Sequence, residues 1–177
     1  MQWGNGMDHR ELLRSQYAFA QDNLEAAIAR CPAELLTKTI GGTLTNSIGS
    51  TYVHTVVTQD LMLVGGLMGR QPVYHESEIG KKVGFELPES PVITQDYTTN
   101  LTFEVEPLRE YAGAVRAAVD GYLEAASEEE LQAEVPFGPK LQTKLWMFGT
   151  LGVWHIASHQ GEIAALMGLE GLQGQMF

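Results

Sequence analysis

The stretch Trp154-His155-Ile156-Ala157-Ser158-His159-Gln160-Gly161-Glu162-Ile163 is the most informative part of this sequence. It lies within a longer amphipathic segment, Thr143 to Leu172, and carries two histidines four residues apart. Residues at i and i+4 lie one above the other on a helix, so His155 and His159 present their imidazoles to the same point. Two imidazoles can fill two corners of a tetrahedral metal site, which needs at least one more ligand from elsewhere.

His54 is the best candidate for the additional ligand. It lies about eight residues into another helical segment, near its middle, and His155 lies near the middle of its own segment. Residues at mid-helix sit at the same level of a four-helix bundle whichever way each helix points, and bundles build metal sites from facing helices. Three histidines leave one position open for water or a thiol, as in catalytic zinc sites. Isoleucine at position 156 excludes the HExxH zincin motif.

A histidine pair on an amphipathic helix also has a simpler explanation. Neutral histidine is tolerated in partly buried positions, so an HxxxH pattern alone indicates metal binding only weakly. The addition of His54 from another helix strengthens the metal hypothesis. His9, in the first turn of the first helix, and His75, in a loop, are predicted to be surface residues.

Glu162 is the candidate catalytic residue. It follows His159 by three residues and shares its helix face, one turn further on. It can orient a ligand imidazole, act as a base, or be a solvated residue at the edge of the face. Gln59, Asp60 and Gln160 are weaker candidates for residues that surround the site. Trp146 and Trp154 are predicted to form part of the core or of the wall of the site.

Apolar residues recur with helical spacing in four segments, at about 8–30, 46–68, 104–126 and 143–168, which predicts an all-α four-helix bundle. Asp8 can cap the first segment, together with Glu11. The region Gly69–Asn100 has no sustained period and carries several prolines and glycines. Because about ten extended residues span a helix of ~30 Å, this region is long enough to start the third helix parallel to the second. Loops of this length are often functional.

Composition limits the classes of partner. The chain has 177 residues, which suits one domain over residues 1–177. Its net charge of −11, with no basic patch, argues against nucleic-acid binding. A single cysteine excludes a disulfide framework within the chain and fits a reducing compartment. No signal peptide or apolar stretch of membrane-spanning length is present, so we expect a cytoplasmic protein with no membrane contact.

The order and spacing of the histidines resemble the DinB-like family of four-helix bundles. In that family a histidine near the middle of the second helix joins an HxxxH pair on the fourth helix. The matching residues here are His54, His155 and His159, followed by Gln160-Gly161-Glu162-Ile163. The sequence departs from the family pattern in the long region Gly69–Asn100 and in Glu162, where glutamine is commoner.

The resemblance implies an up-down-down-up bundle, a divalent metal ion, most often zinc or nickel, and frequently a homodimer. It also implies a metal-dependent enzyme acting on a small molecule, which activates water as a hydrolase or a low-molecular-weight thiol as an S-transferase. The competing hypothesis is a non-catalytic bundle that serves in binding or dimerisation and whose metal site is structural or vestigial.

Overall fold

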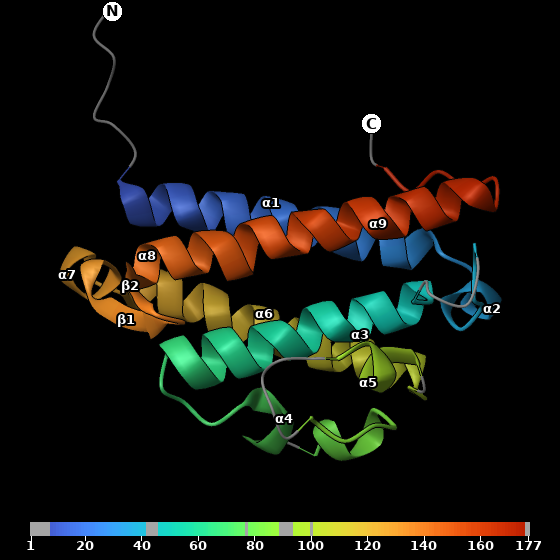
Figure 1. Cartoon of the computed structure of the whole chain (residues 1–177), viewed down its shortest axis with the longest axis horizontal. Coiled ribbons are helices and arrows are strands. Elements are labelled where there is room, and N and C mark those ends of the chain that lie inside the picture. Colours follow the sequence, from blue (N-terminus) through green and yellow to red (C-terminus); the bar gives the residue numbers. More distant parts are fainter. Residues whose placement is uncertain (1–7, 42–45, 77, 89–93, 100, 176–177) are drawn as a thin grey trace, which may run out of the picture.

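The computed structural model describes residues 8–41, 46–76, 78–88, 94–99 and 101–175, and most of these residues are helical (Figure 1). Long helices lie side by side, with α1 and α3 each contacting both α6 and α9. Two of the long segments contain a stretch of π-helix, which we call the first and second π segments. The bounds are α1 His9–Arg30; α3 Ile48–Thr58 with the first π segment Gln59–Leu67; α6 Val105–Ala125; and α8 Lys144–Met147, the second π segment Phe148–Trp154 and α9 His155–Leu169.

The long helices lie where the sequence predicts them, so the all-α class is confirmed at this level. Their starts are set by side chains that accept a hydrogen bond from an otherwise unpaired backbone N–H. Asp8 accepts from the Glu11 amide at 2.7 Å, as predicted. Ser47 caps α3 and Thr143 caps α8 in the same way. Between them the helices bury a large apolar core that includes Tyr17, Leu24, Tyr52, Val56, Leu63, Leu108, Tyr111, Val115, Phe148, Ile156 and Ile163.

A short β-hairpin interrupts the helices between the third and fourth predicted helical segments, where the sequence analysis predicts no strand. Strands β1 (Glu134–Phe137) and β2 (Lys140–Thr143) pair antiparallel, with Glu134 opposite Thr143. Gly138 makes the turn with a φ of 59°, a left-handed conformation that glycine adopts without strain. The hairpin follows the short helix α7 (Glu128–Gln132), which Ser127 caps, and leads directly into α8.

The region predicted as a loop, Gly69–Asn100, contains short helices in its described parts. They are α4 (Val73–Glu76), a 3-10 turn at Gly80–Lys82 and α5 (Gln95–Thr99); a further short helix, α2 (Ala33–Leu36), lies earlier in the chain. None of them is long enough to show a helical period in the sequence, which explains why the pattern indicated a loop.

Asp60, in the first π segment, fixes the start of the region Gly69–Asn100, which connects the second and third long helices and which we call the crossover. Its side chain is fully buried and accepts hydrogen bonds from the backbone N–H groups of Val73 at 2.7 Å and Tyr74 at 3.0 Å. The Tyr111 hydroxyl on α6 donates to the same carboxylate at 2.6 Å. Burial raises the pKa of Asp60, whereas these three donors act in the opposite direction. One carboxylate thus joins the second helical segment, the crossover and α6.

The two π segments lie against each other. The first follows the turns of α3 that carry His54, and the second ends immediately before His155. Stretches of π-helix are rare and occur frequently at functional sites. Within the described ranges, no helix is long and apolar enough to cross a membrane.

Candidate metal centre

Three histidines from two helices converge at one point. His54 comes from α3, and His155 and His159 come from the first turns of α9. The Nε2 atom of His155 lies 3.2 Å from the Nε2 of His54 and 3.2 Å from the Nε2 of His159. One ring nitrogen from each residue lies within 4.8 Å of the other two. Among the described residues, this is the one group of three or more histidine, cysteine or acidic side chains arranged this way.

These separations fit a tetrahedral ion. Imidazole nitrogens bind zinc at about 2.0–2.1 Å, so two of them on one tetrahedral ion lie roughly 3.3 Å apart. The two Nε2 separations of 3.2 Å at His155 agree with that value. The donor set, three imidazoles and no thiolate, suits zinc, nickel and other divalent first-row ions. The residues present therefore fit the metal that the sequence predicts.

The protonation states also favour metal binding. Burial, together with the positive charge that His159 can carry, lowers the pKa of His54 to about 4, and the charge of Glu162 acts in the opposite direction. Burial likewise lowers the pKa of His155 to about 3, with His159 and His54 acting in the same direction. Both imidazoles are therefore neutral at pH 7, and each has a nitrogen lone pair available to a cation.

Glu162 lies against the centre from the next turn of α9. Its carboxylate accepts a hydrogen bond from Nδ1 of His159 at 2.8 Å. This contact fixes the tautomer that carries its proton on Nδ1, so the Nε2 lone pair of His159 points to the centre. The carboxylate is half exposed, with a side-chain exposure of 53%. Of the three roles open to Glu162 from the sequence, the geometry agrees best with orienting a ligand.

Three buried polar atoms on the helices that carry the histidines have no hydrogen-bond partner among the described residues. Nδ1 of His155 is buried and makes no hydrogen bond to the described residues. The hydroxyls of Thr51 and Thr58 are in the same state, and the two threonines lie three residues before and four residues after His54. Helical spacing puts both on the face of α3 that carries His54. Neither threonine was predicted, although their spacing from His54 is visible in the sequence.

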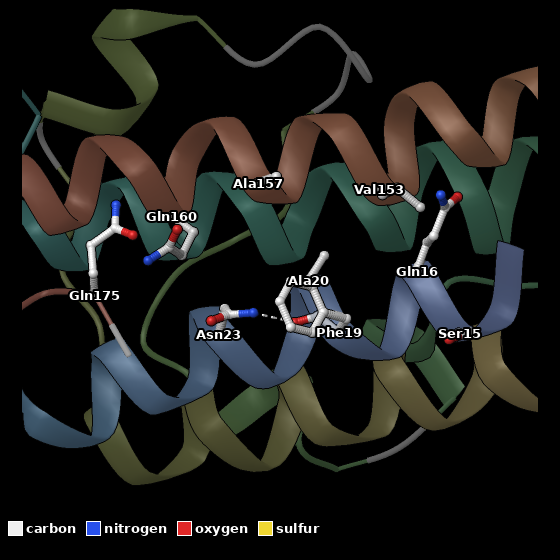
Figure 2. Close-up of a pocket in the computed structure, with 9 residues that line it drawn as sticks. All are labelled: Ser15, Gln16, Phe19, Ala20, Asn23, Val153, Ala157, Gln160 and Gln175. Carbon is white, nitrogen blue, oxygen red and sulfur yellow. Dashed lines mark hydrogen bonds between the residues drawn. The ribbon is translucent and has the colours of Figure 1, made fainter. Parts of the chain in front are cut away.

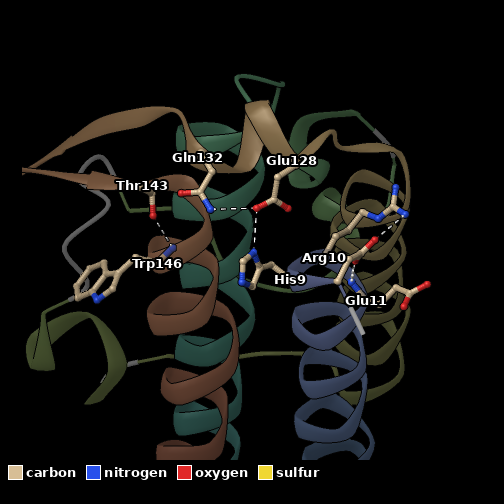
Figure 3. A network of polar contacts seen from close by, with 8 residues as sticks. His9, Arg10, Glu11, Glu128, Gln132, Thr143 and Trp146 are labelled. Atoms are coloured by element: carbon tan, nitrogen blue, oxygen red, sulfur yellow. Dashed lines mark hydrogen bonds and ion pairs between the residues drawn. The ribbon is translucent and has the colours of Figure 1, made fainter. Parts of the chain in front are cut away.

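The other histidines lie elsewhere, as predicted. His9 is exposed and donates from Nδ1 to Glu128 at 2.9 Å, in a polar network that joins the start of α1 to α7 (Figure 3). Glu128 also accepts from Gln132 at 3.1 Å. His75 is exposed in α4, and its ring meets that of Tyr74 edge to face.

Three weaker candidates from the sequence, Gln59, Asp60 and Gln160, take part in contacts other than those of the histidines. Gln59 accepts from the Tyr17 hydroxyl at 2.8 Å within a buried network, Asp60 binds the crossover, and Gln160 donates to the Gly174 carbonyl at 3.5 Å. The hydrogen-bond partners of these polar side chains thus come from the tertiary structure and not from the histidine centre.

The tryptophans also differ from expectation, since both are exposed. The exposed fraction is 42% for Trp146 and 65% for Trp154. Helical spacing explains Trp154, because His155 and Ile156 already occupy the inward side of this turn.

Comparison with known proteins agrees with this geometry. The sequence model of the DinB superfamily matches residues 16–163, which include all three histidines and Glu162. The chain belongs to the DinB superfamily. The family predicted from the histidine pattern is therefore confirmed.

Among solved structures, this DinB superfamily chain is similar to a conserved protein from Enterococcus faecalis. The TM-score is 0.78 at 19% sequence identity, and the match covers 93% of this chain and 98% of the other. At that identity the likeness shows the fold alone. No curated protein matches the sequence.

Proposed function

We propose that this protein is a divalent-metal-dependent enzyme whose ion is held by His54, His155 and His159. The observation that carries the proposal is the convergence of one ring nitrogen from each histidine, with both Nε2 separations at His155 suited to one tetrahedral ion. Membership of the DinB superfamily supports it. A divalent ion held there lowers the pKa of a water or thiol that completes its coordination, making the nucleophile available at neutral pH. The reaction is then hydrolysis, or transfer to a low-molecular-weight thiol, on a small-molecule substrate.

Each residue of the centre has a distinct part in this proposal. His54 and His155 stay neutral because they are buried, so both would hold the ion, and the ion would activate the nucleophile. We assign Glu162 to orienting His159, because its carboxylate is already engaged with Nδ1 of that imidazole. A base role would require it to leave this contact. Zinc and nickel are the preferred ions, since imidazole ligands suit both.

Cobalt(II) substitution tests both the site and the nucleophile. One equivalent of cobalt added to metal-free protein should give the visible absorption of a four- or five-coordinate ion. A low-molecular-weight thiol should change that spectrum and add sulfur-to-metal charge-transfer absorption, because a thiolate can occupy the open position. A spectrum that thiol leaves unchanged favours water as nucleophile. A protein that takes up neither cobalt, zinc nor nickel contradicts the proposed function.

The second candidate function is a non-catalytic binding or dimerisation module. The observation that favours it is a patch of exposed apolar side chains formed by Phe137 on the hairpin and Trp146 on α8. The rings of Phe137 and Trp146 lie in contact, with centroids 5.6 Å apart.

We propose that the chain forms a homodimer, a proposal supported by the family resemblance and by this hairpin patch. Static light scattering at tens of micromolar should then give twice the chain mass, because a stable interface persists well below that concentration. A monomer at that concentration contradicts the dimer, and a Trp146→Ser variant tests whether the patch forms it.

We also propose an arrangement of the helices and a cellular compartment for this protein. We propose one domain over residues 1–177 with up-down-down-up topology, supported by a crossover long enough to join parallel helices and by the pairing of α1 and α3 with both α6 and α9. The single cysteine, Cys31, is buried. It suits a reducing compartment, and we place the protein in the cytoplasm.

A further inference from the structure

A groove runs between α1 and α9 (Figure 2). Its volume is about 380 Å³. Ala157 and Gln160 contribute to it from α9, and helical spacing puts them opposite His155 and His159. Small-ligand sites typically have volumes of about 300–1,000 Å³ and apolar walls with a few placed polar groups. The groove is within this range and is separate from the metal centre.

The groove is apolar along its floor and carries no charge. Phe19 and Ala20 on α1 face Val153 and Ala157 across it. None of the described residues that line it is charged, although the chain has a net charge of −11. A charged ligand would lose hydration here without gaining an opposite charge, so the groove favours an uncharged one.

Two carboxamides give the groove a defined polarity. The side-chain nitrogen of Asn23 donates to the Phe19 carbonyl at 2.8 Å, and that of Gln160 donates to the Gly174 carbonyl at 3.5 Å. One N–H of each side chain is thus engaged, and both side-chain oxygens remain open, because no described residue donates to either oxygen. The groove therefore offers two open acceptors to a ligand that carries donors, beside the polar side chains of Ser15, Gln16 and Gln175.

The C-terminal segment forms a further wall. The guanidinium of Arg30 donates to the carbonyls of Gln173 at 3.4 Å and Gly174 at 3.3 Å. Gly174 lies so close to Ala164 on α9 that a side chain there would overlap it. These contacts hold Gln175 at the groove (Figure 2), so the cavity exists before any ligand binds. A preformed site loses less free energy to ordering when a ligand binds.

We infer that this groove binds a small uncharged molecule with a flat apolar body and one or two N–H or O–H donors. The apolar body lies between Phe19 and Val153, and the donors meet the oxygens of Asn23 and Gln160. The site requires no metal ion, so its occupancy can be measured on metal-free protein, and a failure there leaves the proposed enzymatic function untouched.

Indole and 1-methylindole provide a matched pair of probes, because they share the same ring system and only indole has an N–H donor, which a methyl group replaces in 1-methylindole. Titration into ¹⁵N-labelled metal-free protein should shift backbone amides of α1 and α9 along the groove. Indole should bind about 2- to 10-fold more tightly than 1-methylindole, which is the effect of one hydrogen bond. A negatively charged analogue, indole-3-acetate, should bind more weakly than indole.

Two variants make the result specific. Gln160→Leu removes one acceptor and should reduce the preference for indole over 1-methylindole. Ala157→Phe fills the groove from an exposed position and should abolish the shifts without unfolding the protein, as circular dichroism would verify. Equal affinity for the two probes, shifts that persist in Ala157→Phe, or no shift at millimolar indole would overturn the inference. Concentration-dependent shifts of the same amides without probe would also overturn it, by showing that a second copy covers the groove.

Discussion

Replacing His54 by alanine should lower the affinity for zinc or nickel by more than about 100-fold, because loss of an outer-shell partner alone costs about 10- to 100-fold. His155→Ala and His159→Ala should have effects of the same size. Each variant leaves two imidazoles, too few to hold a tetrahedral ion firmly. Isothermal titration of metal-free protein with zinc gives the three affinities directly. A His54→Ala variant that binds as tightly as the unchanged protein contradicts the three-histidine site.

The chain contains its own controls for this experiment. His9→Ala and His75→Ala should keep full affinity, because both side chains are exposed and distant from the converging nitrogens. Glu162→Gln should weaken binding by 100-fold or less, since glutamine can still accept from Nδ1 of His159. Acid should weaken binding as well, because protonated imidazole cannot ligate. For His54 and His155 this competition should begin well below pH 6.5, because their pKa values are lowered to about 4 and about 3.

Asp60→Ala should lower the free energy of unfolding by roughly 3–5 kcal/mol, the largest stability effect we expect from one side chain. The carboxylate is fully buried and accepts from two backbone amides and the Tyr111 hydroxyl. Its removal strands these three donors in an apolar interior, where each costs about 1–3 kcal/mol unless water enters. Urea denaturation followed by circular dichroism measures the change.

The matched control is Tyr111→Phe, which removes one donor and leaves the two amide contacts to Asp60 intact. Its cost should be about 1 kcal/mol. Limited proteolysis should cut Asp60→Ala within the crossover sooner than Tyr111→Phe, because the start of α4 has lost its anchor. A cost for Asp60→Ala no greater than that for Tyr111→Phe would show that the carboxylate is not the anchor.

The candidate centre could be predicted from the sequence because most of its residues lie close together on one helix. The i, i+4 spacing of His155 and His159 and the i+3 spacing of Glu162 needed only a helix, and α9 supplies it. The position of His54 at mid-helix then sufficed for convergence. Gln59 and Asp60 could not be assigned in this way. Their partners come from α1, α6 and the crossover, and no pattern in the sequence indicates those distant contacts.

The hairpin and the π segments show the other limits of sequence patterns. The strands of the hairpin have four residues each and are largely exposed, so they lack the alternation of buried and polar residues that reveals a strand. The residues of both π segments continue the apolar content of the helices around them. Nothing in composition distinguishes a wider turn from an ordinary one, and the helices were therefore predicted as uniform.

The second π segment has a consequence for how related chains are aligned. A π turn closes its hydrogen bonds over five residues where an α turn uses four, so it accommodates an additional residue while the helix continues in the same direction on both sides. A relative that lacks one residue between Met147 and His155 can run as plain α-helix there and still direct its HxxxH pair toward the second helix. A single-residue gap in this part of an alignment is thus compatible with an intact histidine centre.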